Sequence, residues 1–219
     1  MPNLNIKSLC KEAFEFSKAE SKHAESSLYG VTDGKAVGTY LEHKFKTHLK
    51  GRYKFSEGNS ASGIDFPQLN VDMKVTSITQ PQSSCPFKTA RQKIYGLGYS
   101  LLIFVYQKSD NSKNKTATLN ILHTIFVSQE QTADFQTTAG ILKILANNGN
   151  KDDILAFILE RNLPVEEIGA NKIAEEVLKN PPQQGFLTIS NALQWRLQYG
   201  RVIEVAGQED GVISVYRAS

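Results

Sequence analysis

Apolar residues recur every four positions in the segment 34–50, at Val37, Leu41, Phe45 and Leu49. This period predicts an amphipathic helix. A strand is expected next at 52–55. Apolar and polar residues then alternate from Val71 to Ser77, which is typical of a strand whose two faces meet different surroundings.

Two later apolar runs, at 101–106 and 119–127, are bounded by polar segments and predict buried strands. Before them, a helix that Ser83 or Ser84 could cap is expected to run through 92–98. Helices and strands in this order predict an α/β fold with a mixed central sheet flanked by helices.

The last third of the chain has a different pattern. Three helices are expected, at 152–161, 166–179 and 190–199, followed by a hairpin of 201–206 and 212–216. This order resembles a winged helix-turn-helix, whose recognition helix would offer polar side chains to DNA: Asn191, Gln194, Arg196 and Gln198.

The alternative for this region is a helical cap on the sheet or a dimer interface. The net charge of −3 over 151–219 favours that alternative slightly, because a DNA reader is expected to be basic. We therefore expect a core with N-terminal helices at 1–150 and a helical or winged-helix region at 151–219.

Candidate chemistry lies around the strand that starts at Val71. Asp65 precedes a short turn, and Asp72 and Lys74 share the polar side of the strand, so the two acids and the lysine are expected at the end of a β-hairpin. The alternative is a solvated strand face with a weak ion pair, worth at most about 1 kcal/mol.

Two acids held close together on one face repel, so either one of them takes a raised pKa or a cation neutralises both. Oxygen ligands without a nearby group of Cys or His favour Mg²⁺, held by Asp65, Asp72 and substrate phosphate, with the Met73 carbonyl as a further ligand. Lys74 could orient or deprotonate an attacking water. The reaction that this arrangement predicts is phosphodiester hydrolysis.

The run from Asp65 to Lys74 resembles the metal-binding hairpin of the PD-(D/E)XK nuclease superfamily, as found in MutH-type and type II restriction endonucleases. Ile64 stands where a proline often precedes the first acid, and Asp72 where glutamate is commoner. The resemblance is sharp over 63–77 and diffuse over 34–127. It implies cleavage of double-stranded DNA that leaves a 5′ phosphate.

The resemblance also implies a further acid on the helix before the hairpin, where it orients water or helps to hold a second metal. Glu42 lies next to the apolar stripe of the expected helix 34–50 and matches that position. The alternative is an exposed helix glutamate.

Positive charge is concentrated in the first two thirds of the chain. The net charge is +3 over 1–60, +3 over 61–150 and −3 over 151–219. Side chains that could contact DNA phosphates or bases come from the expected helix and from the segment after the hairpin: Lys44, Lys46, Lys50, Arg52, Lys88, Arg91, Gln92 and Lys93. A basic helix face that is merely solvated is the alternative.

Other classes of protein are excluded by composition. No apolar run approaches the roughly 18 to 20 residues of a membrane span, and the polar start of the chain is not a secretory signal, so we expect a cytoplasmic protein without membrane contact. Cys10 and Cys85 are too few for a disulfide framework or a zinc site.

The sequence therefore predicts a Mg²⁺-dependent, site-specific endonuclease, most simply a type II restriction enzyme. Two alternatives stay open: a MutH-like strand-nicking or repair nuclease directed by a partner, and a non-catalytic DNA-binding protein with a nuclease-like fold. The resemblance implies a homodimer on double-stranded DNA and a cognate DNA methyltransferase in the same system.

Overall fold

The computed structural model describes residues 1–58, 63–85, 89–190 and 196–218. The chain forms two compact units. The first contains Met1–Ser83, Leu101–Val127 and Ile203–Ser219, and the second contains Ser84–Ser100 and Ser128–Val202.

The first unit is built on the long central strands β4 (Ser100–Asn111) and β5 (Thr116–Val127), which pair antiparallel. The sheet order is β1-β5-β4-β2, with β1 at Ala24–Glu25 and β2 at Val71–Ser77. The last strand, β8 (Val212–Arg217), pairs with β5 from His123 to Val127.

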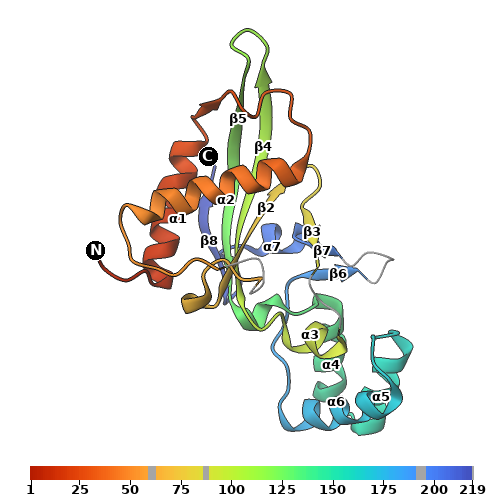
Figure 1. Cartoon of the computed structure of the whole chain (residues 1–219). Coiled ribbons are helices and arrows are strands. Elements are labelled where there is room, and N and C mark those ends of the chain that lie inside the picture. Colours follow the sequence, from red (N-terminus) through yellow and green to blue (C-terminus); the bar gives the residue numbers. More distant parts are fainter. Residues whose placement is uncertain (59–62, 86–88, 191–195, 219) are drawn as a thin grey trace. The chain divides into compact units, whose positions relative to one another are not determined.

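Two helices lie across one face of this sheet (Figure 1). Helix α1 (Ile6–Glu20) packs on β5 and β8, and helix α2 (Gly34–Lys50) packs on β2. Asp33 caps α2 by accepting hydrogen bonds from the backbone N–H groups of Lys35 and Ala36.

Aromatic rings hold α2 in place. The ring of Phe45 on α2 lies 5.2 Å from that of Phe104 on β4 and 6.4 Å from that of Phe66, centroid to centroid. All three side chains are fully buried. Such edge-to-face contacts add directional packing to the burial of apolar area, so the helix, the sheet and the turn before β2 are fixed to one another.

The second unit is mainly helical and has its own core. Its elements are α3 (Ala90–Tyr95), η2 (Gln129–Thr132), α4 (Phe135–Ala146), α5 (Lys151–Glu160), α6 (Glu167–Lys179), β6 (Thr188–Ser190) and β7 (Arg196–Gln198). Ile141, Ile154, Ile158 and Val177 form the centre of this core. Two short elements lie at the unit boundaries: β3 (Gln82–Ser84) and α7 (Gly200–Val205).

The predicted α/β fold with a mixed central sheet flanked by helices is confirmed. The helix at 34–50 and the strand at 71–77 have the predicted bounds, and the helices at 152–161 and 166–179 lie within one residue of them. The strands expected at 101–106 and 119–127 are present and longer. Among the described helices, none has the length and apolar character to cross a membrane.

Two predicted elements in the first half were wrong. Residues 52–55 do not form a strand, because the N–H groups of Arg52 and Tyr53 both bond to the Leu49 carbonyl at 2.9 Å and close the end of α2. The helix after the hairpin is shorter than expected and is capped by Thr89, not by Ser83 or Ser84.

The recognition helix expected at 190–199 is also wrong for the part that is described. Ser190 ends β6 and pairs with Arg196 at the start of β7. Leu197 and Tyr199 are buried while Gln198 between them is exposed, which is the period of a strand. Asn191 and Gln194 lie outside the described residues.

The expected hairpin of 201–206 and 212–216 is wrong as well. Gly200–Val205 is helix α7, and β8 pairs with β5 in the central sheet. This pairing places the end of the chain in the first unit, so the division of the chain differs from the expected boundary at residue 150.

Candidate active site

The candidate site forms where the chain turns into β2. Phe66 and Val71 exchange two backbone hydrogen bonds of 2.9 and 3.3 Å across a 3-10 turn, η1 (Pro67–Leu69). Asn70 closes this turn in the left-handed conformation, with φ 54°. The expected hairpin is thus a single bridge, and Asp65 stands just before it.

The bridge brings Asp65 beside the residues of β2. The backbone N–H of Met73 donates a hydrogen bond of 2.9 Å to Asp65 Oδ2. The other oxygen, Oδ1, lies 2.5 Å from Lys46 Nζ on α2. Hydrogen bonds from Lys46 and Met73 and a close contact with Asp72 outweigh the effect of burial, so the pKa of Asp65 is lowered.

Asp72 lies on β2 with only 3 % of its surface exposed. Its Oδ2 is buried and forms an ion pair with Lys74 Nζ at 2.6 Å. Burial raises the pKa of Asp72 to about 6, against the Lys74 ammonium, which lowers it. A solvated strand face is therefore the wrong description of Asp72.

Glu42 belongs to the same group of charges. It lies one helical turn before Lys46 on α2, so both side chains are on one side of the helix. Burial and then the Asp65 carboxylate raise the pKa of Glu42 to about 7, while Lys74 and Lys46 act in the opposite direction. Opposed pKa shifts among neighbouring acids are typical of catalytic sites.

The donor set fits a hard cation with few protein ligands. Within the described ranges, no group of three or more His, Cys, Asp or Glu residues is placed to enclose a metal. Asp65 and Asp72 are two carboxylates at one point, and the buried Asp72 Oδ2 has the Lys74 ammonium beside it. A cation that keeps several waters and takes one or two carboxylates plus phosphate matches this arrangement.

Sequence analysis did not predict the contact between Lys46 and Asp65. The basic residues around Lys46 predicted a phosphate contact, whereas in the free protein its ammonium pairs with the Asp65 carboxylate and 14 % of its side chain is exposed. The signal that could have revealed this is its spacing of four residues from Glu42, which puts both on one helical face.

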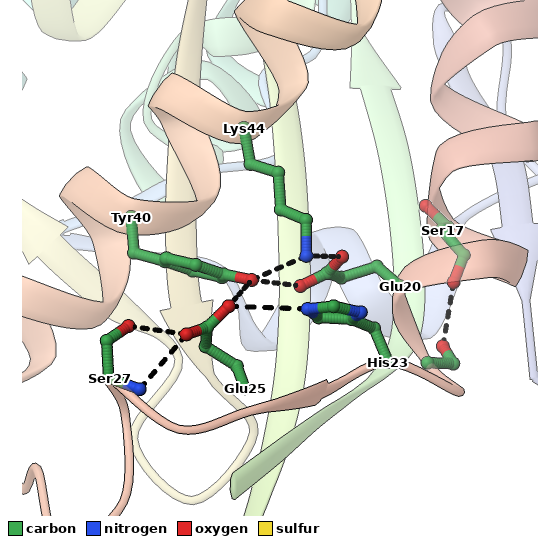
Figure 2. Close-up of polar contacts among 8 residues, drawn as sticks. Ser17, Glu20, His23, Glu25, Ser27, Tyr40 and Lys44 are labelled. Atoms are coloured by element: carbon green, nitrogen blue, oxygen red, sulfur yellow. Dashed lines mark hydrogen bonds and ion pairs between the residues drawn. The ribbon is translucent and has the colours of Figure 1, made fainter. Parts of the chain in front are cut away.

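Lys44, another predicted phosphate contact, pairs with side chains of the protein itself. Figure 2 shows its ammonium between Glu20 and Tyr40, with Nζ 2.9 Å from Glu20 Oε2 and 2.6 Å from the Tyr40 hydroxyl. That hydroxyl donates to Glu20 and Glu25 at 3.1 and 3.2 Å, and burial followed by these carboxylates raises the pKa of Tyr40. Glu20 is 3 % exposed, so Lys44 neutralises a buried charge.

Lys50 and Arg52 have accessible side chains, 55 % and 52 % exposed, and pair with Glu57 and Glu12. In the second unit Arg91 pairs with Glu176. Lys93 is only 4 % exposed, so the predicted contact between Lys93 and DNA is not supported. Lys88 lies outside the described residues, and the roles of Gln92 and Arg196 stay predictions.

A family model described as "Type II restriction enzyme NspV" matches residues 3–214 of this chain. The chain belongs to the NspV family of type II restriction enzymes. A relative with the same description, from Nostoc sp., is 72 % identical over 217 residues, which cover 99 % of each chain. No solved structure matches the chain.

Membership of the NspV family confirms the predicted resemblance and the predicted activity. The chain is a site-specific deoxyribonuclease that acts on DNA. Type II restriction enzymes generally use a divalent metal ion. The NspV family thus favours the restriction enzyme over the partner-directed nickase and the non-catalytic binder.

Proposed function

We propose that Asp65 and Asp72 are the catalytic acids of this restriction enzyme and that they hold Mg²⁺. The observation that supports this most strongly is the convergence of two largely buried carboxylates, with Asp72 Oδ2 balanced in the free protein by Lys74 Nζ at 2.6 Å. Two buried anions at one point need positive charge close by, which ammonium groups or a bound cation can supply. The Met73 carbonyl is a further proposed ligand.

Mg²⁺ bound at these acids would supply Lewis acidity and a more acidic water. The chain's own groups supply the rest. Lys74 Nζ, 24 % exposed and next to Asp72, is placed to orient the attacking water, to accept its proton when uncharged, or to offset phosphate charge when protonated. Glu42, whose pKa of about 7 allows either protonation state near neutrality, is proposed to orient the water. Cleavage would leave a 5′ phosphate.

Lys50, Arg52, Arg91, Gln92 and Arg196 remain the proposed DNA contacts from the described residues. Exposed Arg and Lys side chains suit phosphate, and Arg and Gln can also read base edges in the major groove. We further propose a homodimer, because a two-fold pair of chains suits a palindromic site, and a cognate methyltransferase that protects it.

The test is digestion of unmethylated phage DNA by the purified protein in Mg²⁺, with EDTA and the Lys74→Ala variant alongside. Discrete fragments that disappear in both are expected. Lys108→Ala is the matched control, because Lys108 also pairs with an aspartate two residues away on a strand, Asp110, and lies outside the site. Normal cleavage by folded Lys74→Ala protein would contradict the assignment.

A further inference from the structure

The two carboxylates of the proposed metal site are each matched by an ammonium group in the free protein. Lys46 Nζ lies 2.5 Å from Asp65 Oδ1, and Lys74 Nζ lies 2.6 Å from Asp72 Oδ2. The two lysines cancel the charge of these two carboxylates and leave only Glu42, whose pKa is about 7, as an acid of the group without a matched ammonium. The site therefore attracts a dication more weakly while both lysines are in place.

The two lysines differ in how they are held. Lys74 is two residues from Asp72 on the same strand, so it stays near the site whatever binds there. Lys46 comes from α2, nineteen residues before Asp65, on a flexible four-carbon stem. Its ammonium can leave the carboxylate without any movement of the backbone.

Asp65 is built to stay in position when Lys46 leaves. Lys46 contacts only Oδ1, whereas Oδ2 accepts the hydrogen bond of 2.9 Å from the Met73 N–H. Withdrawal of the lysine therefore uncovers one anionic oxygen and leaves the orientation of the carboxylate unchanged. The uncovered oxygen belongs to the acid that shares the site with Asp72.

DNA supplies what would withdraw Lys46. A phosphodiester brought to the site carries a negative charge, and a lysine ammonium is a strong partner for phosphate oxygens. We propose that Lys46 is a positioning residue that occupies Asp65 Oδ1 in the free protein and passes to a DNA phosphate in the complex, so that cation binding at the two acids is coupled to DNA binding. The proposal rests on the metal site proposed above.

This arrangement links two events that must coincide for cleavage. Coupling of this kind is reciprocal, so DNA that removes Lys46 strengthens cation binding, and the cation in turn strengthens DNA binding. The free protein therefore binds the cation only weakly, and the cation site is complete only when a duplex is bound.

The decisive measurement is Mn²⁺ binding to the DNA-free, full-length protein, followed by the electron paramagnetic resonance signal of free Mn²⁺. Lys46→Met is expected to bind Mn²⁺ about tenfold more tightly than the wild type, since one competing charge is gone. Lys46→Arg keeps the charge and is expected to stay near the wild type. Lys35→Met, at an exposed position of the same helix, is the matched control and is also expected to match it.

Unchanged or weaker Mn²⁺ binding by folded Lys46→Met protein would overturn the proposal, because Lys46 would then not compete for Asp65. Asp72→Asn separates this failure from failure of the metal site itself. If Asp72→Asn binds Mn²⁺ as well as the wild type does, the two-carboxylate site is wrong and the inference about Lys46 falls with it.

A second experiment tests whether Lys46 contacts a DNA phosphate in the complex. Binding of a duplex that contains the mapped cleavage site is measured in EDTA by fluorescence anisotropy at several KCl concentrations. Lys46→Met is expected to reduce the slope of log affinity against log salt by about one, the value for one lost phosphate contact. An unchanged slope would overturn the transfer, and Lys35→Met is again the control.

Discussion

Asp65 Oδ2 accepts a hydrogen bond of 2.9 Å from the backbone N–H of Met73, the residue that follows Asp72 on β2. One acid of the site is therefore oriented by the backbone of the strand that carries the other. The distance between the two carboxylates depends on this bond and on the Phe66–Val71 bridge, not on the sequence spacing alone.

Two substitutions of Asp65 can separate charge from position. Asp65→Asn keeps an oxygen that can accept the Met73 hydrogen bond, whereas Asp65→Ala leaves that N–H without it, and both lose the ion pair with Lys46. We expect both to lose cleavage by more than about 10²-fold. The free energy of unfolding should be lower for Asp65→Ala than for Asp65→Asn, by about 1–3 kcal/mol, because the alanine leaves the Met73 N–H without its acceptor.

Urea unfolding of the two variants measures the stability difference, and digestion of the mapped site measures the activity. Equal unfolding free energies would show that the Met73 hydrogen bond does not hold Asp65. Substantial cleavage by Asp65→Asn would remove Asp65 from the proposed metal ligands.

Glu42 predicts a pH dependence of stability. Its pKa is about 7 in the folded protein, against an ordinary value of 4.5, and burial is the largest cause. Between these values the folded state holds a proton that the unfolded state has lost, so Glu42 destabilises the fold progressively as pH rises from about 5 to about 7. Below a pH of about 4.5, the pKa in the unfolded state, Glu42 is protonated in both states and this loss of stability is absent.

Glu42→Gln cannot ionise, so this loss should be absent. In EDTA, the melting temperature of the variant should rise relative to the wild type between pH 5 and pH 8, and about 1 kcal/mol corresponds to about 2–4 °C in a chain of this size. Glu15→Gln, exposed on α1, is the control for removal of a carboxylate. If the melting temperatures of the wild type and of Glu42→Gln change with pH in the same way, the buried environment of Glu42 would be contradicted.

The difference between Lys44 and Lys50 is open to a paired test. Lys44→Met leaves the buried Glu20 without its ammonium partner and should lower the unfolding free energy by about 1–3 kcal/mol. Lys50→Met breaks an exposed pair with Glu57 and should cost less than about 1 kcal/mol.

DNA binding should show the reverse order. Lys50→Met is expected to reduce the salt slope of duplex binding by about one, and Lys44→Met to leave it unchanged. A reduced slope for stable Lys44→Met protein would restore Lys44 as the phosphate contact that its basic neighbourhood predicts.

Local patterns carried the sequence predictions that succeeded. The four-residue spacing from Val37 to Leu49 reports a helix directly, because one helical face repeats at that interval. Asp65, Asp72 and Lys74 lie within ten residues of one another in a recognisable order, which predicted that they lie together, as the structure has them, while their catalytic roles stay a proposal. These signals need no knowledge of distant partners.

Long-range pairing explains the failures. The contact of Lys46 with Asp65 in the free protein is not predicted by the sequence, because Asp65 lies beyond the end of the helix. Val202, Ile203 and Val205 are β-branched residues, which favour strands, yet all three lie in helix α7. Strand β8 pairs with β5, from His123↔Arg217 to Val127↔Val212, and no local pattern predicts a pairing between segments so far apart in the chain.

Two glycines after α3 differ in how strongly the structure requires glycine. Gly96 and Gly98 both have positive φ, 89° and 86°, and Gly96 also has ψ −179°, a combination that is essentially restricted to glycine. A Cβ at Gly96 would lie 2.6 Å from the Gln129 carbonyl oxygen and 2.7 Å from Thr132 Oγ1, whereas one at Gly98 would have no described atom within 4 Å.

Gly98→Ala is therefore expected to lower the unfolding free energy by about 1–2 kcal/mol, the backbone contribution alone. Gly96→Ala should cost clearly more, because the turn that contains Gln129 and Thr132 must move, and Thr132 Oγ1 also accepts the Leu97 N–H at 2.8 Å. Urea unfolding of the two variants measures the difference. If the two variants lose equal unfolding free energy, η2 can move aside at little cost. The close approach of η2 to the end of α3 would then not explain the glycine at position 96.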